Sequence, residues 1–310
     1  MITLKATSAF GNPLYNKNFF IWIEEVNRLG EGRVFIDYIG GPEIASWSDQ
    51  FEALRTGIAD ISNHAPSYMV GEVLEGDVLS AVKPGAKYQI EHFFQNEEVR
   101  NIIKEVSRAK AGVVPVGIGL SAGAQGTLIF GKWSDGLPTL DLTGFKIRAH
   151  SIAAEAVEKL GGASVWLPAS ERYDGMQRGI IDGVTANPRD LYDGGEFEVY
   201  KYIMRQPIWE PNTAHYISAD AWDTLPEDVQ RLLDFTGRYM EIGFLWERLQ
   251  SVQEAIDYFV EEEGTVVFDI TPETERKLAQ LTRAAYLEKI RDESEYGARL
   301  YLLLKDHTGA

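Results

Sequence analysis

Residues 226–263 have the sequence character of one continuous helix, with only Gly237 and Gly243 as interior breaks. A helix of this length is much longer than the three to four turns that are average in globular proteins. In a soluble chain it normally bridges two bodies rather than packing inside one. We therefore expect a molecule of two lobes that share this helix.

Strand and helix patterns alternate along the rest of the chain. We expect a strand at residues 2–6, an amphipathic helix at residues 13–28 and a second strand at residues 33–38. After a glycine-rich crossing at residues 117–126 the alternation begins again, and a final helix is expected from residue 272 to about residue 305. Such alternation predicts parallel strands covered by helices, which is an α/β fold.

The length of the chain also favours two domains. With 310 residues, 45% of them hydrophobic, it can bury two cores of ordinary size. We assign residues 1–121 and 214–250 to lobe I, and residues 122–213 and 251–310 to lobe II. Trp22 and Trp246 lie within amphipathic helices, so both are expected in the core.

The composition excludes several classes of function. The chain has 30 Lys and Arg against 47 Asp and Glu, a net charge of -17. This argues against nucleic acid and against an anionic membrane surface, both of which attract basic proteins. The absence of cysteine removes thiol catalysis, iron–sulfur ligation and disulfides. No segment approaches the roughly 18 apolar residues of a membrane-spanning helix.

The most informative segment runs from residue 141 to residue 188. Arg148 ends a short expected strand, and Asn187 follows a later one, held in an extended turn by Pro188. A guanidinium fork and a carboxamide that converge from two strand ends can hold a small carboxylate at two points. The alternative is a surface arginine and a turn asparagine.

A second function is suggested by Gly119-Leu-Ser121-Ala-Gly123, which matches the nucleophile elbow of serine hydrolases and follows a strand. The elbow requires a helix directly after it, but the sequence that follows is rich in glycine and β-branched residues and predicts a strand. A serine hydrolase built on Ser121 is therefore the alternative hypothesis. The five histidines show neither i, i+4 pairing nor the HExxH pattern, so we expect no metal and no cofactor.

Taken in order, several segments resemble one family, the extracytoplasmic solute receptors of TRAP transporters of the DctP type. The resemblance covers nearly the whole chain. The segments that carry it are Gly57-Ile-Ala-Asp60, Asp141-Leu-Thr-Gly-Phe-Lys-Ile-Arg148, Leu167-Pro-Ala-Ser-Glu171, the run from Tyr173 to Gly183, Asn187-Pro188, and Trp222-Asp-Thr-Leu-Pro-Glu-Asp-Val-Gln230.

This resemblance implies a periplasmic binding protein fold, with two α/β lobes, a central cleft, crossing strands and a long helix spanning both lobes. It implies a non-catalytic protein that captures an organic acid and delivers it to the small and large membrane subunits of the transporter. Arg148 corresponds to the family's carboxylate-binding arginine and Asn187 to its cleft asparagine. Trp209 falls at another cleft position, and Gln125 lies where sialic-acid receptors have a second arginine. We expect a periplasmic monomer whose signal peptide has been removed.

The sequence departs from the family pattern at several positions. Ala169 replaces an aromatic residue and Ala186 an acid, while Ala65 and Tyr68 stand where sialic-acid receptors have an acid and an arginine, which argues against sialic acid. The expected lining has more aromatic surface than a small dicarboxylate requires. Whether the ligand is a sugar acid or an aromatic acid stays open. Besides Arg148, Asn187 and Gln125, the expected lining consists of Trp47, Asn63, His64, Tyr68 and Trp209.

Overall fold

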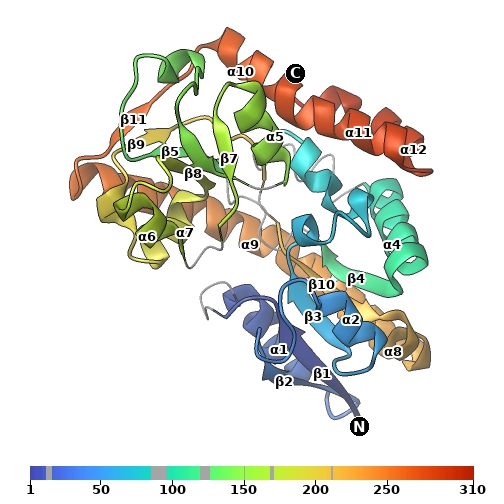
Figure 1. The fold of residues 1–310 in the computed structure, drawn as a ribbon. Helices are drawn as coiled ribbons and strands as arrows, with labels where there is room; N and C mark the ends of the chain where they lie inside the picture. The colour runs from blue at the N-terminus through green and yellow to red at the C-terminus, as the bar shows by residue number, and fades with distance from the viewer. Residues whose placement is uncertain (12–15, 85–95, 119–125, 150, 168–170, 211) are drawn as a thin grey trace.

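A computed structural model describes residues 1–11, 16–84, 96–118, 126–149, 151–167, 171–210 and 212–310. These residues form two separate β-sheets with helices packed around each, and the long helix α9 (Glu227–Glu261) runs behind both (Figure 1). The expected α/β fold with two lobes is confirmed.

The first sheet has five strands in the order β2-β1-β3-β10-β4. β1 pairs in parallel with β2 and β3, whereas β10 is antiparallel to both of its neighbours. Alternation alone predicted parallel strands, and β10 differs because the chain enters this sheet from the other lobe. The strands are β1 (Ile2–Ser8), β2 (Val34–Gly40), β3 (Ile61–His64), β4 (Val113–Ile118) and β10 (Ala214–Ser218).

The second sheet has six strands in the order β11-β9-β5-β8-β6-β7. β6 is parallel to β7 and β8, whereas β5, the strand after the glycine-rich crossing, is antiparallel to β8 and β9. The strands are β5 (Thr127–Phe130), β6 (Lys146–Arg148), β7 (Ala163–Val165), β8 (Gly183–Ala186), β9 (Tyr202–Met204) and β11 (Val266–Phe268).

Two connections join the sheets. One leads from β4 to β5 and the other from β9 to β10. They meet at Gly126 and Trp209, which form an isolated antiparallel bridge in which the Gly126 amide donates to the Trp209 carbonyl at 3.1 Å. These are the crossing strands that the family resemblance implied.

Helices cover both sheets, and side chains cap several of them. Asn96, Asn187, Ser218 and Thr271 each accept a hydrogen bond from a backbone amide in the first turn of α4, α7, α8 and α10. Among the described residues, the α-helices other than α9 are α1 (Lys17–Leu29), α2 (Gln50–Arg55), α4 (Glu97–Ala111), α5 (Ser151–Lys159), α6 (Arg172–Gln177), α7 (Pro188–Asp193), α8 (Ala219–Thr224), α10 (Pro272–Ala279), α11 (Ala285–Glu293) and α12 (Gly297–Leu304).

Helix α9 contacts α1 and β4 in the first lobe and α7 in the second. Gly237 makes the approach to β4 possible, because a Cβ there would overlap the Val116 carbonyl oxygen. One turn later Glu241, which is buried, accepts two hydrogen bonds from Arg100 at 2.7 and 3.2 Å and one from the Ile118 amide at 2.7 Å. The helix is therefore anchored to the strand that leads into the crossing.

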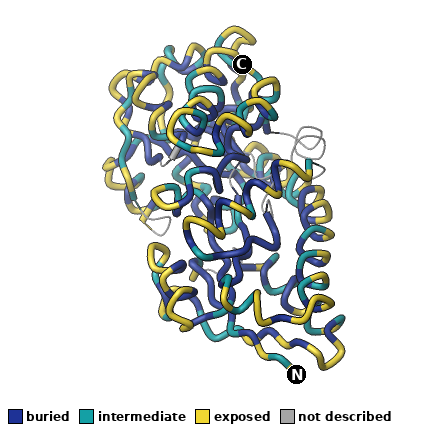
Figure 2. The backbone as a smooth tube through the Cα atoms, turned by 90° about the vertical axis from the view of Figure 1, so that its right-hand side faces the viewer, coloured by how far each residue is buried: buried dark blue, intermediate teal, exposed yellow. Residues whose placement is uncertain are grey.

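The two tryptophans expected in the core have different environments. Trp22 is fully buried and donates to the Thr236 hydroxyl at 3.1 Å, as its amphipathic helix predicted. Trp246 is 58% exposed, so the prediction for it was wrong. Helical spacing places Trp246 on the same outer face of α9 as Phe235 and Tyr239, which are also exposed. Figure 2 shows that buried segments run through the interior of both halves of the molecule.

The final helix is interrupted, in contrast to the single helix expected from residue 272 to about residue 305. α11 ends at Glu293 and α12 begins at Gly297. Ser294 has an extended backbone, and its hydroxyl accepts a hydrogen bond from the Tyr296 amide at 3.0 Å. Serine competes in this way with helical hydrogen bonding, which explains why the helix stops here.

Candidate functional site

Arg148 is the last residue of β6 and lies beside Val165 of β7 and Val184 of β8. It is buried, and its Nε donates to the Leu167 carbonyl at 2.9 Å. Among the described residues no carboxylate pairs with it and no group accepts from its two terminal nitrogens. Burial, together with the positive charge of Arg172, lowers the pKa of Arg148 to about 10, so the side chain is still a cation at neutral pH.

Asn187 follows β8, the parallel neighbour of β6, and caps α7. Its Oδ1 accepts from the Arg189 amide at 3.0 Å, a geometry that Pro188 at the first helical position favours. Its Nδ2 is buried and has no partner among the described residues. A buried donor without an acceptor is costly, so this nitrogen is suited to bind an oxygen atom of a ligand. Because β6 and β8 are parallel, Arg148 and Asn187 emerge at the same edge of the sheet.

A second buried arginine, which no sequence pattern singled out, lies near Arg148. Arg172 begins α6, and its Nη2 pairs with Glu196 Oε1 at 2.6 Å. The Tyr200 hydroxyl donates to the other oxygen of Glu196 at 3.3 Å. Burial raises the pKa of Glu196, and the charges of Arg172 and Arg148 oppose this increase. Arg172 and Glu196 are both almost completely shielded from solvent.

Tyr68 brings the first lobe to these arginines. It ends the short helical turn Pro66–Tyr68 after β3. Burial raises the pKa of its hydroxyl, and the charges of Arg148 and Arg172 oppose the shift, so the ring lies within electrostatic reach of both cations. Tyr68 packs edge-on against Trp47 with ring centroids 5.6 Å apart, and the Trp47 ring centroid lies 6.0 Å from that of Trp166, the residue that follows β7. A chain of aromatic rings therefore crosses from the first lobe to the second.

The other residues expected to line the cleft occupy different positions. Trp209 is buried at the crossing, where its ring covers Gly126 so closely that an added Cβ would lie 2.7 Å from it. Asn63 is buried, and its Nδ2 donates to Ser8 and Asn16. Gln125, Ala169 and the hydrolase serine Ser121 lie outside the described residues.

His64 is packed within the core of the first lobe. Its ring contacts Phe51 and Tyr216 at centroid distances of 4.7 and 4.5 Å, and its Nδ1 lies 3.2 Å from the Ser62 hydroxyl. Burial lowers the pKa of His64 to about 3, so the ring is neutral at physiological pH.

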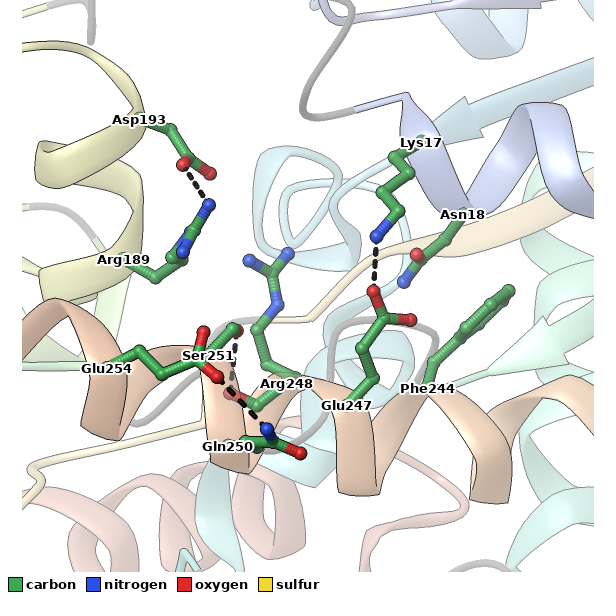
Figure 3. Close-up of a pocket in the computed structure, with 10 residues that line it drawn as sticks. All are labelled: Lys17, Asn18, Arg189, Asp193, Phe244, Glu247, Arg248, Gln250, Ser251 and Glu254. Atoms are coloured by element: carbon green, nitrogen blue, oxygen red, sulfur yellow. Dashed lines mark hydrogen bonds and ion pairs between the residues drawn. The ribbon is translucent and has the colours of Figure 1, made fainter.

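A groove of about 460 Å3 lies between the lobes over the middle of α9 (Figure 3). Its cations are already paired: Lys17 with Glu247, Arg189 with Asp193 at 2.6 Å, and Arg248 with Asp190 at 3.6 Å. An anion would gain less here than at Arg148, which has no such pair. The walls are Lys17 and Asn18 of α1 and Arg189 and Asp193 of α7, and the floor is Phe244, Glu247, Arg248, Gln250, Ser251 and Glu254 of α9.

The described site is equipped for binding. It offers a buried cation, an amide donor and an aromatic wall, and the described part of the chain contains no cluster of acidic or histidine side chains that could hold a metal ion. Within the described residues, no helix is both long enough and apolar enough to span a membrane.

Comparison with known proteins identifies the family. Residues 11–292 match the model of the bacterial extracellular solute-binding proteins, family 7, also called DctP. A curated solute-binding protein of Albidiferax ferrireducens is 25% identical over 288 residues, which are 90% of this chain and 82% of the relative.

Solved structures share the fold at low sequence identity. A TRAP periplasmic solute-binding protein from Desulfovibrio salexigens, solved with bound orotic acid, superimposes with a TM-score of 0.83 at 15% identity and 99% coverage of both chains. A Bordetella pertussis extracytoplasmic solute receptor that binds pyroglutamic acid gives a TM-score of 0.82 at 17% identity, covering 98% of this chain and 100% of the other.

The family comprises binding proteins rather than catalysts, so the comparisons give no support to the serine hydrolase alternative. The family match spans most of the sequence, and the structural matches span nearly all of it. The chain therefore belongs to family 7 of the bacterial extracellular solute-binding proteins, the DctP family.

Proposed function

We propose that this protein captures an organic acid between its lobes, with the carboxylate on Arg148, and delivers it to the membrane subunits of a TRAP transporter in the periplasm. The observation that carries the proposal is the buried guanidinium of Arg148, which has no carboxylate partner among the described residues. Burying a charge without a partner costs free energy, and a ligand carboxylate would offset this cost.

The neighbouring groups suit the same ligand. Asn187 Nδ2 is a second donor at the same sheet edge, and Tyr68 and Trp47 supply aromatic surface from the first lobe. Trp209 completes the proposed lining near the crossing, while Asn63 and His64 support it from within the first lobe. Gln125 is included in the proposed lining by its position in the sequence alone. The similar receptors that were solved with orotic acid and with pyroglutamic acid bind acids, which favours an acid here as well.

Capture would proceed by hinge closure of two lobes, with residues 1–121 and 214–250 in one and residues 122–213 and 251–310 in the other. Closing the cleft excludes water and strengthens the ion pair with Arg148. The partners in this proposal are the small and large membrane subunits, and the binding protein acts as a monomer without a cofactor.

A thermal-shift screen of organic acids tests the proposal. A ligand at about one hundred times its dissociation constant adds about 2.7 kcal/mol to the free energy of unfolding. The matched control is the primary amide of each acid that binds, because it keeps the shape and removes the charge. We expect the acid to raise the melting temperature and the amide to leave it unchanged. Equal stabilisation by the amide would contradict the assignment of a carboxylate to Arg148.

A further inference from the structure

The ion pair between Arg172 and Glu196 determines how much positive charge the cleft presents. Three ionised side chains influence one another at the end of β6: Arg148, Arg172 and Glu196. Glu196 is held 2.6 Å from Arg172, whereas Arg148 has no carboxylate partner in the described part of the chain. Two cations and one anion leave a single positive charge.

The next charged side chains around this group are paired. Asp190 also influences Tyr68 and Arg172, and it lies 3.6 Å from Arg248. Arg189 pairs with Asp193 on the same helix at 2.6 Å. Arg248 and Arg189 therefore each have a carboxylate neighbour, whereas Arg148 has none among the described residues.

We infer that Glu196 makes the cleft selective for monocarboxylates, because it neutralises Arg172 and leaves Arg148 as the one cation of the described site without a carboxylate partner. This inference rests on the proposed function and specifies its substrate class. The second carboxylate of a dicarboxylate would enter a closed, desolvated site without a cation, and burying an unpaired charge is strongly unfavourable.

The surrounding structure fixes Glu196 in this role. Its amide donates to the Leu191 carbonyl at 2.9 Å at the end of α7, and the Tyr200 hydroxyl binds its second oxygen. A Cβ at Gly194 would lie 2.9 Å from Glu196 Oε1, so glycine at this position leaves space for the carboxylate where it pairs with Arg172. Glu196 therefore stays on Arg172 and does not compete for Arg148.

Glu196→Gln tests this role, because it keeps the shape of the side chain and removes its charge. The probes are pairs of acids matched in length, such as hexanoate with adipate, 2-hydroxybutyrate with malate and 4-methylbenzoate with terephthalate, measured by calorimetry. For the pair whose monocarboxylate binds best, we expect the parent protein to prefer the monocarboxylate at least tenfold. In Glu196→Gln, Arg172 loses its carboxylate partner and can bind a second carboxylate of the ligand, so the ratio should shift toward the dicarboxylate by about tenfold or more.

Two further variants separate charge from structure. Glu198→Gln removes the same charge from an exposed position two residues away and should leave the ratio unchanged. The double variant Arg172→Met with Glu196→Met removes both charges, keeps the net charge of the cleft and should retain the preference for the monocarboxylate. It also tests the inference if Glu196→Gln alone does not fold.

The possible results distinguish the inference from the proposed function. If no acid of either kind binds the parent protein, the proposed function fails. If acids bind but dicarboxylates bind the parent as tightly as their partners, or if Glu196→Gln weakens both acids of a pair equally, the proposed function stands and the selectivity inference is overturned.

Discussion

Arg148→Ala should abolish most of the affinity for the ligand without unfolding the protein. Removing one partner of a desolvated charge pair typically costs about 2 to 5 kcal/mol of binding free energy. This corresponds to a loss of affinity of about thirtyfold at the low end and several thousandfold at the high end. Arg148→Lys keeps the charge but loses the planar fork, so its affinity should lie between those of the parent and the alanine variant.

The structure also predicts the stability of the unliganded variants. Arg148 makes one hydrogen bond to the described part of the protein, from Nε to the Leu167 carbonyl, and such a bond contributes about 1 kcal/mol. In Arg148→Ala its loss is offset because that variant no longer buries a cation beside Arg172. The unliganded alanine variant should therefore melt within a few degrees of the parent. Calorimetric titration with an acid found by screening is the assay, and parent-like affinity in both variants would refute the reasoning.

Three further predictions concern the rest of the molecule. Gly237→Ala should lower the free energy of unfolding by about 1 to 3 kcal/mol in denaturant titrations, because its Cβ would overlap β4. Gly243→Ala on the same helix places its Cβ in open space and should be neutral or stabilising. Burial lowers the pKa of His64 and of His215 to about 3, so the unfolded chain binds more protons than the folded protein between about pH 6.5 and pH 3. The free energy of unfolding should therefore fall as the pH is lowered through this window, by about 2 kcal/mol per histidine at pH 5. A flat stability profile from pH 7 to pH 5 would contradict this. Trp47→Phe should reduce the change in tryptophan fluorescence on ligand binding, because the Trp47 ring is partly exposed and contacts Trp166 of the opposite lobe. An undiminished fluorescence change would assign the signal to other tryptophans.

The fold was largely predictable because it rests on local patterns. Alternating strands and helices gave the two sheets, and the uninterrupted helical sequence after Pro226 gave α9. The features that were mispredicted depend on contacts. Trp246 has the helical spacing of a core residue, but its face of α9 is exposed where it lies. Ser294 interrupts the last helix through a side-chain hydrogen bond that periodicity does not reveal.

The candidate site was predictable only in part. Arg148 and Asn187 stand at strand ends, where parallel strands bring side chains together, so sequence order alone suggested both. Arg172 and Glu196 are 24 residues apart, on a short helix and in a glycine-flanked loop. No local pattern joins them, and each has the sequence context of a surface charge. Only the tertiary structure shows that they form a buried pair.

A crystal structure of the protein with an acid selected by the thermal-shift screen tests the central claim most directly. We predict that the ligand carboxylate accepts two hydrogen bonds from the terminal nitrogens of Arg148, at about 2.7 to 2.9 Å. We also expect a ligand oxygen within hydrogen-bond distance of Asn187 Nδ2. A ligand bound instead in the groove between α1 and α7, with Arg148 left without an anion, would contradict the account.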